Sequence, residues 1–142
     1  MVLSVIAILQ QLSLEGHTIS TKNGEAMSPD EVVDLIDALE GEVNNGGFDQ
    51  YFYNSAGDRT ADAIQALEMI GAFKMAEIVK KAAQMFPNGM PPKDRFERQA
   101  ILLRLYPKAE VFRHLDEEFY DYPDKLGDLL AKYRSSSQPD CR

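Results

Sequence analysis

The strongest folding signal in the chain is the segment SPDEVVDLIDALEGEV, residues 28–43. Ser28 occupies an N-cap position, Pro29 follows at the first helical position, and Glu31 completes a capping-box pattern. After these start signals, apolar residues recur at helical spacing, namely Val32, Leu35, Ile36, Leu39 and Val43. The segment therefore predicts an amphipathic helix with one face buried in a core.

The next segment, NNGGFDQYFYN at residues 44–54, combines glycines, amides and aromatic residues. We expect its two glycines to end the helix, because glycine readily adopts the left-handed backbone that a C-cap needs, and residues 48–54 could form a short helix of their own. We expect its aromatic rings to pack beneath the turn and its amides to satisfy exposed groups at helix ends. Alternatively, the amides and a tyrosine line a small-ligand pocket. The motif residues are Asn45, Gly46, Gly47, Phe48, Gln50, Tyr51, Phe52 and Asn54.

In the rest of the chain, further helices are predicted, and turn-forming residues separate them. Helical apolar spacing covers residues 60–71, 73–85, 94–106, 111–120 and 122–133. The fold class is therefore all-α, with a single compact multi-helix domain at residues 28–134. Residues 1–27 supply an apolar element and an irregular or short hairpin-like segment, with Asn23-Gly24 as its turn. Residues 135–142 are expected to form a flexible polar tail.

The composition limits the classes of partner and compartment. The chain has 142 residues, 15 basic and 23 acidic, and a net charge of −8. Such a chain lacks the basic footprint that direct nucleic-acid binding requires. Its apolar start precedes the first basic residue, Lys22, unlike a secretory signal, and is interrupted at Gln10 and Gln11 before it could span a membrane. We expect a cytoplasmic protein that does not bind membranes.

Signatures of catalysis and of metal binding are weak. The single cysteine, Cys141, excludes a disulfide within the chain and a thiolate zinc cluster. No glycine pattern matches a phosphate-binding loop, and no serine has a nucleophile-elbow setting. His114 and Glu118 are four residues apart and could share a metal ion, although no second histidine lies nearby in the sequence. We expect no metal, no cofactor and no enzymatic activity.

The charge is unevenly distributed. Residues 1–43 carry a net charge of −7, residues 44–72 carry −3, residues 73–108 carry +5, and residues 109–142 carry −3. The acidic front concentrates on the predicted helix, where steps of four, three and three residues place its acids on one face. These acids are Asp30, Asp34, Asp37 and Glu40, with Glu31 and Glu42 beside them. No lysine or arginine lies four residues from any of them.

Two interpretations of this acidic row remain open. It is a solvated face whose first acids complement the helix dipole, or it faces a basic partner. A helical turn rises about 5.4 Å, comparable with the spacing of phosphates along a strand, so such a row can imitate a DNA backbone. Asp116, Glu117 and Asp121, near Glu118 and Asp124, form a second acidic candidate. Basic residues at Lys80, Lys81 and Arg98 could interrupt an acidic face.

Residues 42–58, together with Ala66-Leu67 and residues 70–72, closely resemble a bacterial family of small all-helical, DNA-mimic-like domains. The resemblance covers roughly residues 32–133, and Phe86-Pro87, Arg98 and residues 115–119 also fit it. It implies an all-helical fold and relates the chain to an acidic protein that binds a helix-turn-helix transcription factor and keeps it from its operator. The matching motif contains glycines, amides and aromatics, so the acidic face has to be judged on this chain's own residues.

The sequence thus favours a non-enzymatic acidic binding protein, a DNA mimic that occupies the basic surface of a DNA-binding protein or transcription factor. One alternative is a small-ligand or enzymatic domain built around the NNGGFDQYFYN segment, and another is an immunity-like antagonist of a basic protein. A homodimer is compatible with each of them. The expected partner-binding residues are Asp30, Glu31, Asp34, Asp37, Glu40, Glu42, Asp116, Glu117 and Asp121.

Overall fold

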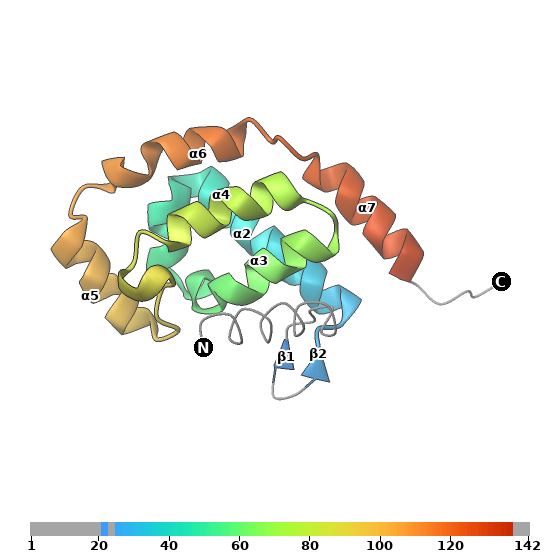
Figure 1. The fold of residues 1–142 in the computed structure, drawn as a ribbon, viewed down its shortest axis with the longest axis horizontal. Coiled ribbons are helices and arrows are strands. Elements are labelled where there is room, and N and C mark those ends of the chain that lie inside the picture. The colour runs from blue at the N-terminus through green and yellow to red at the C-terminus, as the bar shows by residue number, and fades with distance from the viewer. Residues whose placement is uncertain (1–20, 23–24, 138–142) are drawn as a thin grey trace, which may run out of the picture.

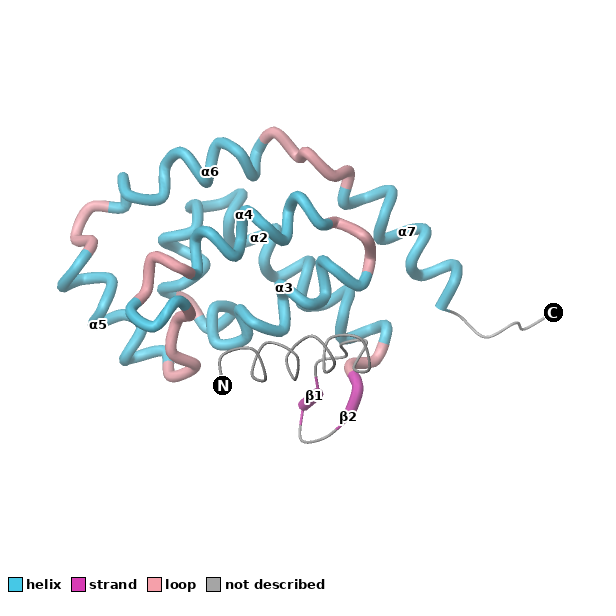
Figure 2. The backbone as a smooth tube through the Cα atoms, in the orientation of Figure 1, coloured by secondary structure: helices cyan, strands magenta, loops and turns pink. Residues whose placement is uncertain are grey.

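The computed structural model describes residues 21–22 and 25–137 of the chain. Within them, helices make up most of the backbone, and strands are confined to one short hairpin (Figure 2). The all-α fold class is therefore confirmed. The elements in order are β1 (Thr21–Lys22), β2 (Glu25–Ala26), α2 (Pro29–Tyr53), η1 (Ser55–Arg59), α3 (Thr60–Met69), α4 (Phe73–Ala83), η2 (Pro87–Gly89), α5 (Arg95–Leu105), η3 (Ala109–Phe112), α6 (Arg113–Tyr120) and α7 (Leu126–Ser137).

The two ends of the chain were predicted with different success. A hairpin does precede the domain, because β1 and β2 pair antiparallel with Thr21 opposite Ala26. Its turn at Asn23-Gly24, the apolar element of residues 1–20 and the tail residues 138–142 lie outside the described residues. The last helix, α7, extends through residues 135–137, which were expected to belong to the polar tail. It also begins at Leu126, later than expected.

Helix α2 is the central element of the domain. It contacts η1, α3, α5, α6 and α7, while α4 packs on α3 and α6 (Figure 1). Its start follows the sequence signal, since the hydroxyl of Ser28 accepts a hydrogen bond from the backbone amide of Glu31 at 3.1 Å. Its inward residues, among them Val32, Ile36 and Leu39, are completely buried.

The glycine pair bends α2 and does not end it. Gly46 (φ −152°, ψ 18°) and Gly47 (φ 76°, ψ −176°) leave helical geometry, but the helix resumes at Phe48. The positive φ of Gly47 requires glycine in practice, because a side chain there would be strained. We expected the glycines to cap one helix and residues 48–54 to form a second, short one; the structure has both helical stretches but joins them through a kink. The resumed helix needs a new partner for its first amides, and Asp116 supplies one.

Aromatic residues after the kink form the centre of the core, as predicted. Phe48 and Phe52 are fully buried, and Tyr51 is 1% exposed. The ring of Phe52 lies 4.9 Å from that of Phe86 and 5.6 Å from that of Phe112, between centroids. These contacts join the second half of α2 to the residue before η2 and to η3, which are far away in the sequence.

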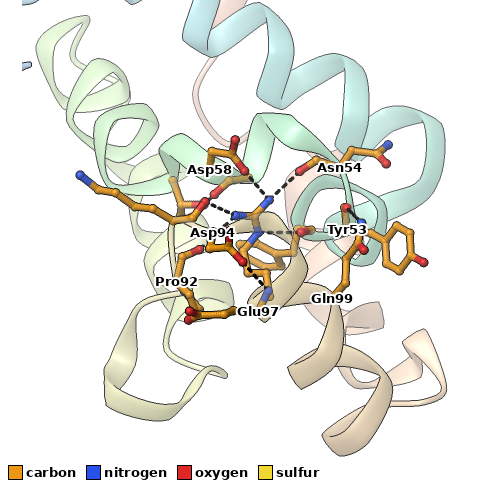
Figure 3. Close-up of polar contacts among 12 residues, drawn as sticks. Tyr53, Asn54, Asp58, Pro92, Asp94, Glu97 and Gln99 are labelled. Carbon is orange, nitrogen blue, oxygen red and sulfur yellow. Dashed lines mark hydrogen bonds and ion pairs between the residues drawn. The ribbon is translucent and has the colours of Figure 1, made fainter.

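A buried arginine fixes the connection between the end of α2 and α5. Arg98 is 0% exposed, and its guanidinium donates hydrogen bonds of 2.7–3.0 Å to four backbone carbonyls and pairs with Asp58 at 2.8 Å (Figure 3). The carbonyls belong to Phe52, Asn54, Pro92 and Lys93. Arg98 therefore does not interrupt an acidic surface, because its guanidinium is buried and bonded to these carbonyls and to Asp58.

Candidate functional site

Three carboxylates form the outward side of the first half of α2. Asp30, Asp34 and Asp37 are exposed, whereas the residues between them on the opposite side of the helix are buried. Among the residues that the structure describes, none of the three takes part in an ion pair. We refer to Asp30, Asp34 and Asp37 as the acidic face. Its helical spacing agrees with the sequence prediction.

The acidic face borders a groove between α2 and η1. Two adjoining hollows of about 550 Å³ and about 520 Å³ share Ala38, Ser55 and Ala56 in their linings. Asp30 and Asp34 line the first hollow, and Asp37 lines the second. The site is therefore an open depression lined by carboxylates and small apolar residues, with Arg59 in the lining of the first hollow and Arg95 in that of the second.

An arginine of the chain itself occupies one end of this groove. Arg59 Nη2 lies 2.6 Å from Glu31 Oε2, and Arg59 Nε lies 3.0 Å from Asp62 Oδ2. The carboxylate of Glu31 is thus partly neutralised within the fold. Sequence reasoning missed Arg59 as a groove residue, although a signal existed, since it is the only basic residue in the acidic segment 44–72.

The remaining two glutamates of the predicted row are held by their own chain. The Tyr122 hydroxyl donates to Glu40 Oε2 at 2.6 Å and accepts from the amide of Asn44 at 2.8 Å. Burial, together with the hydrogen bond to Glu40, raises the pKa of Tyr122 against the opposing effect of the Asn44 amide. Glu40 is therefore anchored to the segment after α6 and is less accessible than the acidic face.

Glu42 is bound by the amides of the glycine-rich motif. Its two oxygens accept hydrogen bonds from Gln50 Nε2 at 3.0 Å and Asn54 Nδ2 at 2.8 Å. Asn45 donates in turn to Gln50 Oε1 at 3.3 Å. These amides were expected to satisfy helix-end groups. They instead bridge the kink of α2 by connecting residues before and after the glycines.

The second acidic candidate divides into structural and exposed residues. Asp116 Oδ1 accepts a hydrogen bond from the backbone amide of Phe48 at 2.8 Å, and burial raises the pKa of Asp116. Asp124 Oδ2 accepts from the backbone amide of Met75 at 2.8 Å, near the start of α4. Glu117 and Asp121 are exposed. The second cluster therefore offers Glu117 and Asp121 as exposed carboxylates, whereas Asp116 and Asp124 are bonded to backbone amides.

The structure also tests whether the glycine-rich motif forms a ligand pocket and whether acidic and histidine side chains gather as a metal site. The aromatic residues of the motif fill the core, which counts against a ligand pocket built from them, and burial raises the pKa of Tyr51 to about 12. Within residues 21–22 and 25–137, no three histidine, cysteine, aspartate or glutamate side chains gather as metal ligands. His114 is exposed. No helix in the described part of the chain has the length and apolar character needed to cross a membrane.

Comparison with known proteins identifies one family. The family described as DMP19-like protein matches residues 25–137, which includes all of α2 through α7. No curated protein and no solved structure matches the chain. The match begins at the hairpin strand β2 and therefore contains the acidic face, the groove and the glycine kink.

Proposed function

Because the chain belongs to the DMP19-like protein (DNA mimic protein 19) family, we propose that its acidic face occupies the basic surface of a DNA-binding protein. Membership of the family points in general to protein partners that bind DNA. One observation supports the assignment of the surface in particular. Asp30, Asp34 and Asp37 are exposed along one side of a groove and have no ion-pair partner among the described residues.

Unpaired exposed carboxylates fit this role better than paired ones. A row of like charges on a helix costs a few tenths of a kcal/mol per pair at spacings of three and four residues. In the described part of the chain, no lysine or arginine forms an ion pair with Asp30, Asp34 or Asp37, although Arg59 and Arg95 line the same hollows. A basic partner relieves the repulsion between these acids on binding, and its guanidinium groups form strong charge-assisted hydrogen bonds with carboxylates.

The proposed partner is a helix-turn-helix protein, whose recognition surface is basic because it contacts DNA phosphates. Successive turns of α2 present carboxylates about 5.4 Å apart, which approximates the spacing of phosphates on one strand. The groove between α2 and η1 gives long basic side chains room to lie against Leu35, Ala38 and Ala56. Long-range attraction would accelerate the encounter, and salt would weaken it.

The test compares the wild-type chain with the variant D30N/D34N/D37N as immobilised baits for proteins from the native cell, at low and at high salt. The control variant E77Q/E110Q/D128N removes the same number of charges at exposed positions on α4, η3 and α7. Wild-type and control baits are expected to retain the same DNA-binding protein, and the triple amide variant to lose it. Equal helical circular dichroism must first show that all three chains are folded.

A second step checks the consequence for DNA. The retained protein is incubated with its operator duplex and increasing amounts of the chain, and the shifted duplex is followed by electrophoresis. Wild-type chain should release the duplex, and D30N/D34N/D37N should not. Retention of the same protein by the triple variant, with unchanged salt dependence, contradicts the proposal. A basic partner that binds no DNA would instead support the immunity-like antagonist.

A further inference from the structure

Helix α5 carries two large apolar side chains on its outward face. Phe96 is 68% exposed and Leu103 is 62% exposed, and their separation of seven residues corresponds to two helical turns. Ala100, which is exposed, small and uncharged, lies between them on the same face, four residues after Phe96 and three before Leu103. Single exposed apolar residues are common, but an aligned set on one helix forms a patch of the kind that marks interaction sites.

The orientation of this face is fixed by the opposite side of α5. Arg98 is completely buried in its network of carbonyls, and Leu102 is 1% exposed in the core. Asp94 caps the start of the helix by accepting a hydrogen bond from the backbone amide of Glu97 at 2.9 Å (Figure 3). These contacts fix the rotation of α5, so Phe96 and Leu103 stay exposed. Helix α5 itself lies at one end of the molecule (Figure 1).

The charged residues beside Phe96 and Leu103 are complementary to those of a second α5 helix that runs antiparallel to the first. Glu97 and Arg104 are exposed, lie seven residues apart and flank the same face as Phe96 and Leu103. If two α5 helices pack antiparallel about a two-fold axis near Ala100, Glu97 faces Arg104 of the second copy and Phe96 faces its Leu103. The small side chain of Ala100 at the axis lets the two helices approach closely. Such self-complementarity is the requirement for an isologous dimer.

We propose that a second copy of this chain docks on the outward face of α5, with the two helices antiparallel. Phe96 and Leu103 supply the apolar contact, and two Glu97–Arg104 pairs determine the direction of packing. The guanidinium of Arg95 lies 5.3 Å from the centroid of the Phe96 ring, within the range of a cation–π contact. The dimer carries two acidic faces, so a target with two sites would be bound with increased avidity.

Sedimentation of the full chain over a concentration series reaching the millimolar range tests this inference. The wild-type chain is expected to show a monomer–dimer equilibrium, and the exchange L103D to weaken it by about tenfold or more, which corresponds to roughly 1.4 kcal/mol. The control is F73D on α4, since Phe73 is also 62% exposed but lies off this face. F73D should dimerise like the wild-type chain.

A charge exchange tests the antiparallel arrangement itself. E97R alone creates two Arg–Arg contacts and R104E alone creates two Glu–Glu contacts, so each variant should be mainly monomeric. An equimolar mixture should form a heterodimer, because both contacts are then of opposite charge. Any of three results overturns the proposal: the wild-type chain stays monomeric, F73D weakens association as strongly as L103D, or the mixture does not associate. None of these outcomes depends on capture of a DNA-binding protein, so the two proposals fail separately.

Discussion

The carboxylate of Asp116 accepts a hydrogen bond of 2.8 Å from the backbone amide of Phe48, 68 residues earlier in the chain. Phe48 is the first residue after the glycine kink, where the resumed helix has an amide without a partner in its own helix. An acid on α6 therefore acts as the N-cap of a helical segment on α2. Asp116, which was predicted to bind a partner, therefore has a structural role.

Replacing this cap should destabilise the fold. D116A leaves the backbone amide of Phe48 without its acceptor, and we expect the free energy of unfolding to fall by about 1 kcal/mol. The control E117A removes an exposed neighbouring carboxylate and should change stability by less than about 0.5 kcal/mol. Urea denaturation followed by circular dichroism measures both. Equal stabilities of the two variants would contradict the capping role.

Two glycines of α2 should respond in opposite directions to alanine. Gly47 has φ 76°, and a Cβ there would lie 2.5 Å from Asp116 Oδ2, so G47A should lower the free energy of unfolding by about 2 kcal/mol or more. A Cβ at Gly41 meets nothing within 4 Å, so G41A should raise it by about 0.5–1 kcal/mol through helix propensity. Thermal unfolding of both variants checks the signs.

The planar guanidinium of Arg98, and not only its positive charge, is expected to be essential for the stability of the fold. R98K retains the charge but loses the planar donors that reach four carbonyls and Asp58, so it should cost about 3 kcal/mol or more. R95K, on the exposed side of the same helix, should cost less than about 0.5 kcal/mol. Chemical denaturation distinguishes them. An R98K chain as stable as R95K would show that the carbonyls find other donors.

Tyr51 should make the folded state sensitive to alkali. Burial raises its pKa from 10.0 to about 12, so both the folded and unfolded chains hold the proton below pH 10. The contribution of Tyr51 is therefore complete below pH 10 and is lost as the pH rises towards 12, because the unfolded chain ionises first. The stability of Y51F should decline less over this window than that of the wild-type chain. Parallel curves would contradict the burial effect.

Arg59 should moderate the binding strength of the groove. R59Q removes the cation that lies 2.6 Å from Glu31, so the negative charge of the groove increases. Binding of a basic partner should become tighter at low salt and more salt-dependent, while stability falls by about 0.2–1 kcal/mol because a partly exposed ion pair is lost. Affinity titrations at several salt concentrations provide the check, with K80Q as a control at the Lys80–Glu68 pair. Weaker binding of R59Q would show that Arg59 contacts the partner.

Local signals predicted the helices well because their causes lie within a few residues. The cap at Ser28, the apolar spacing of α2 and the aromatic cluster after the glycines all have local explanations. The helix boundaries beyond α5 were less accurate. Residues 111–120 were expected as one helix, and the structure has η3 followed by α6. Helix α7 begins only at Leu126, because Tyr122 has a positive φ of 48° and Pro123 follows it, so the backbone is not helical there.

Long-range contacts explain why the acidic residues differ in role. Spacing along α2 was sufficient to place Asp30, Asp34 and Asp37 on one outward face, because a helix has a fixed period. Nothing in that spacing distinguishes them from Glu40 and Glu42, which are held against the chain by Tyr122, Gln50 and Asn54. Asp116 likewise looked like any other acid of its segment. Which carboxylates remain free depends on which side chains the fold brings opposite them, and those neighbours come from as far as 82 residues away.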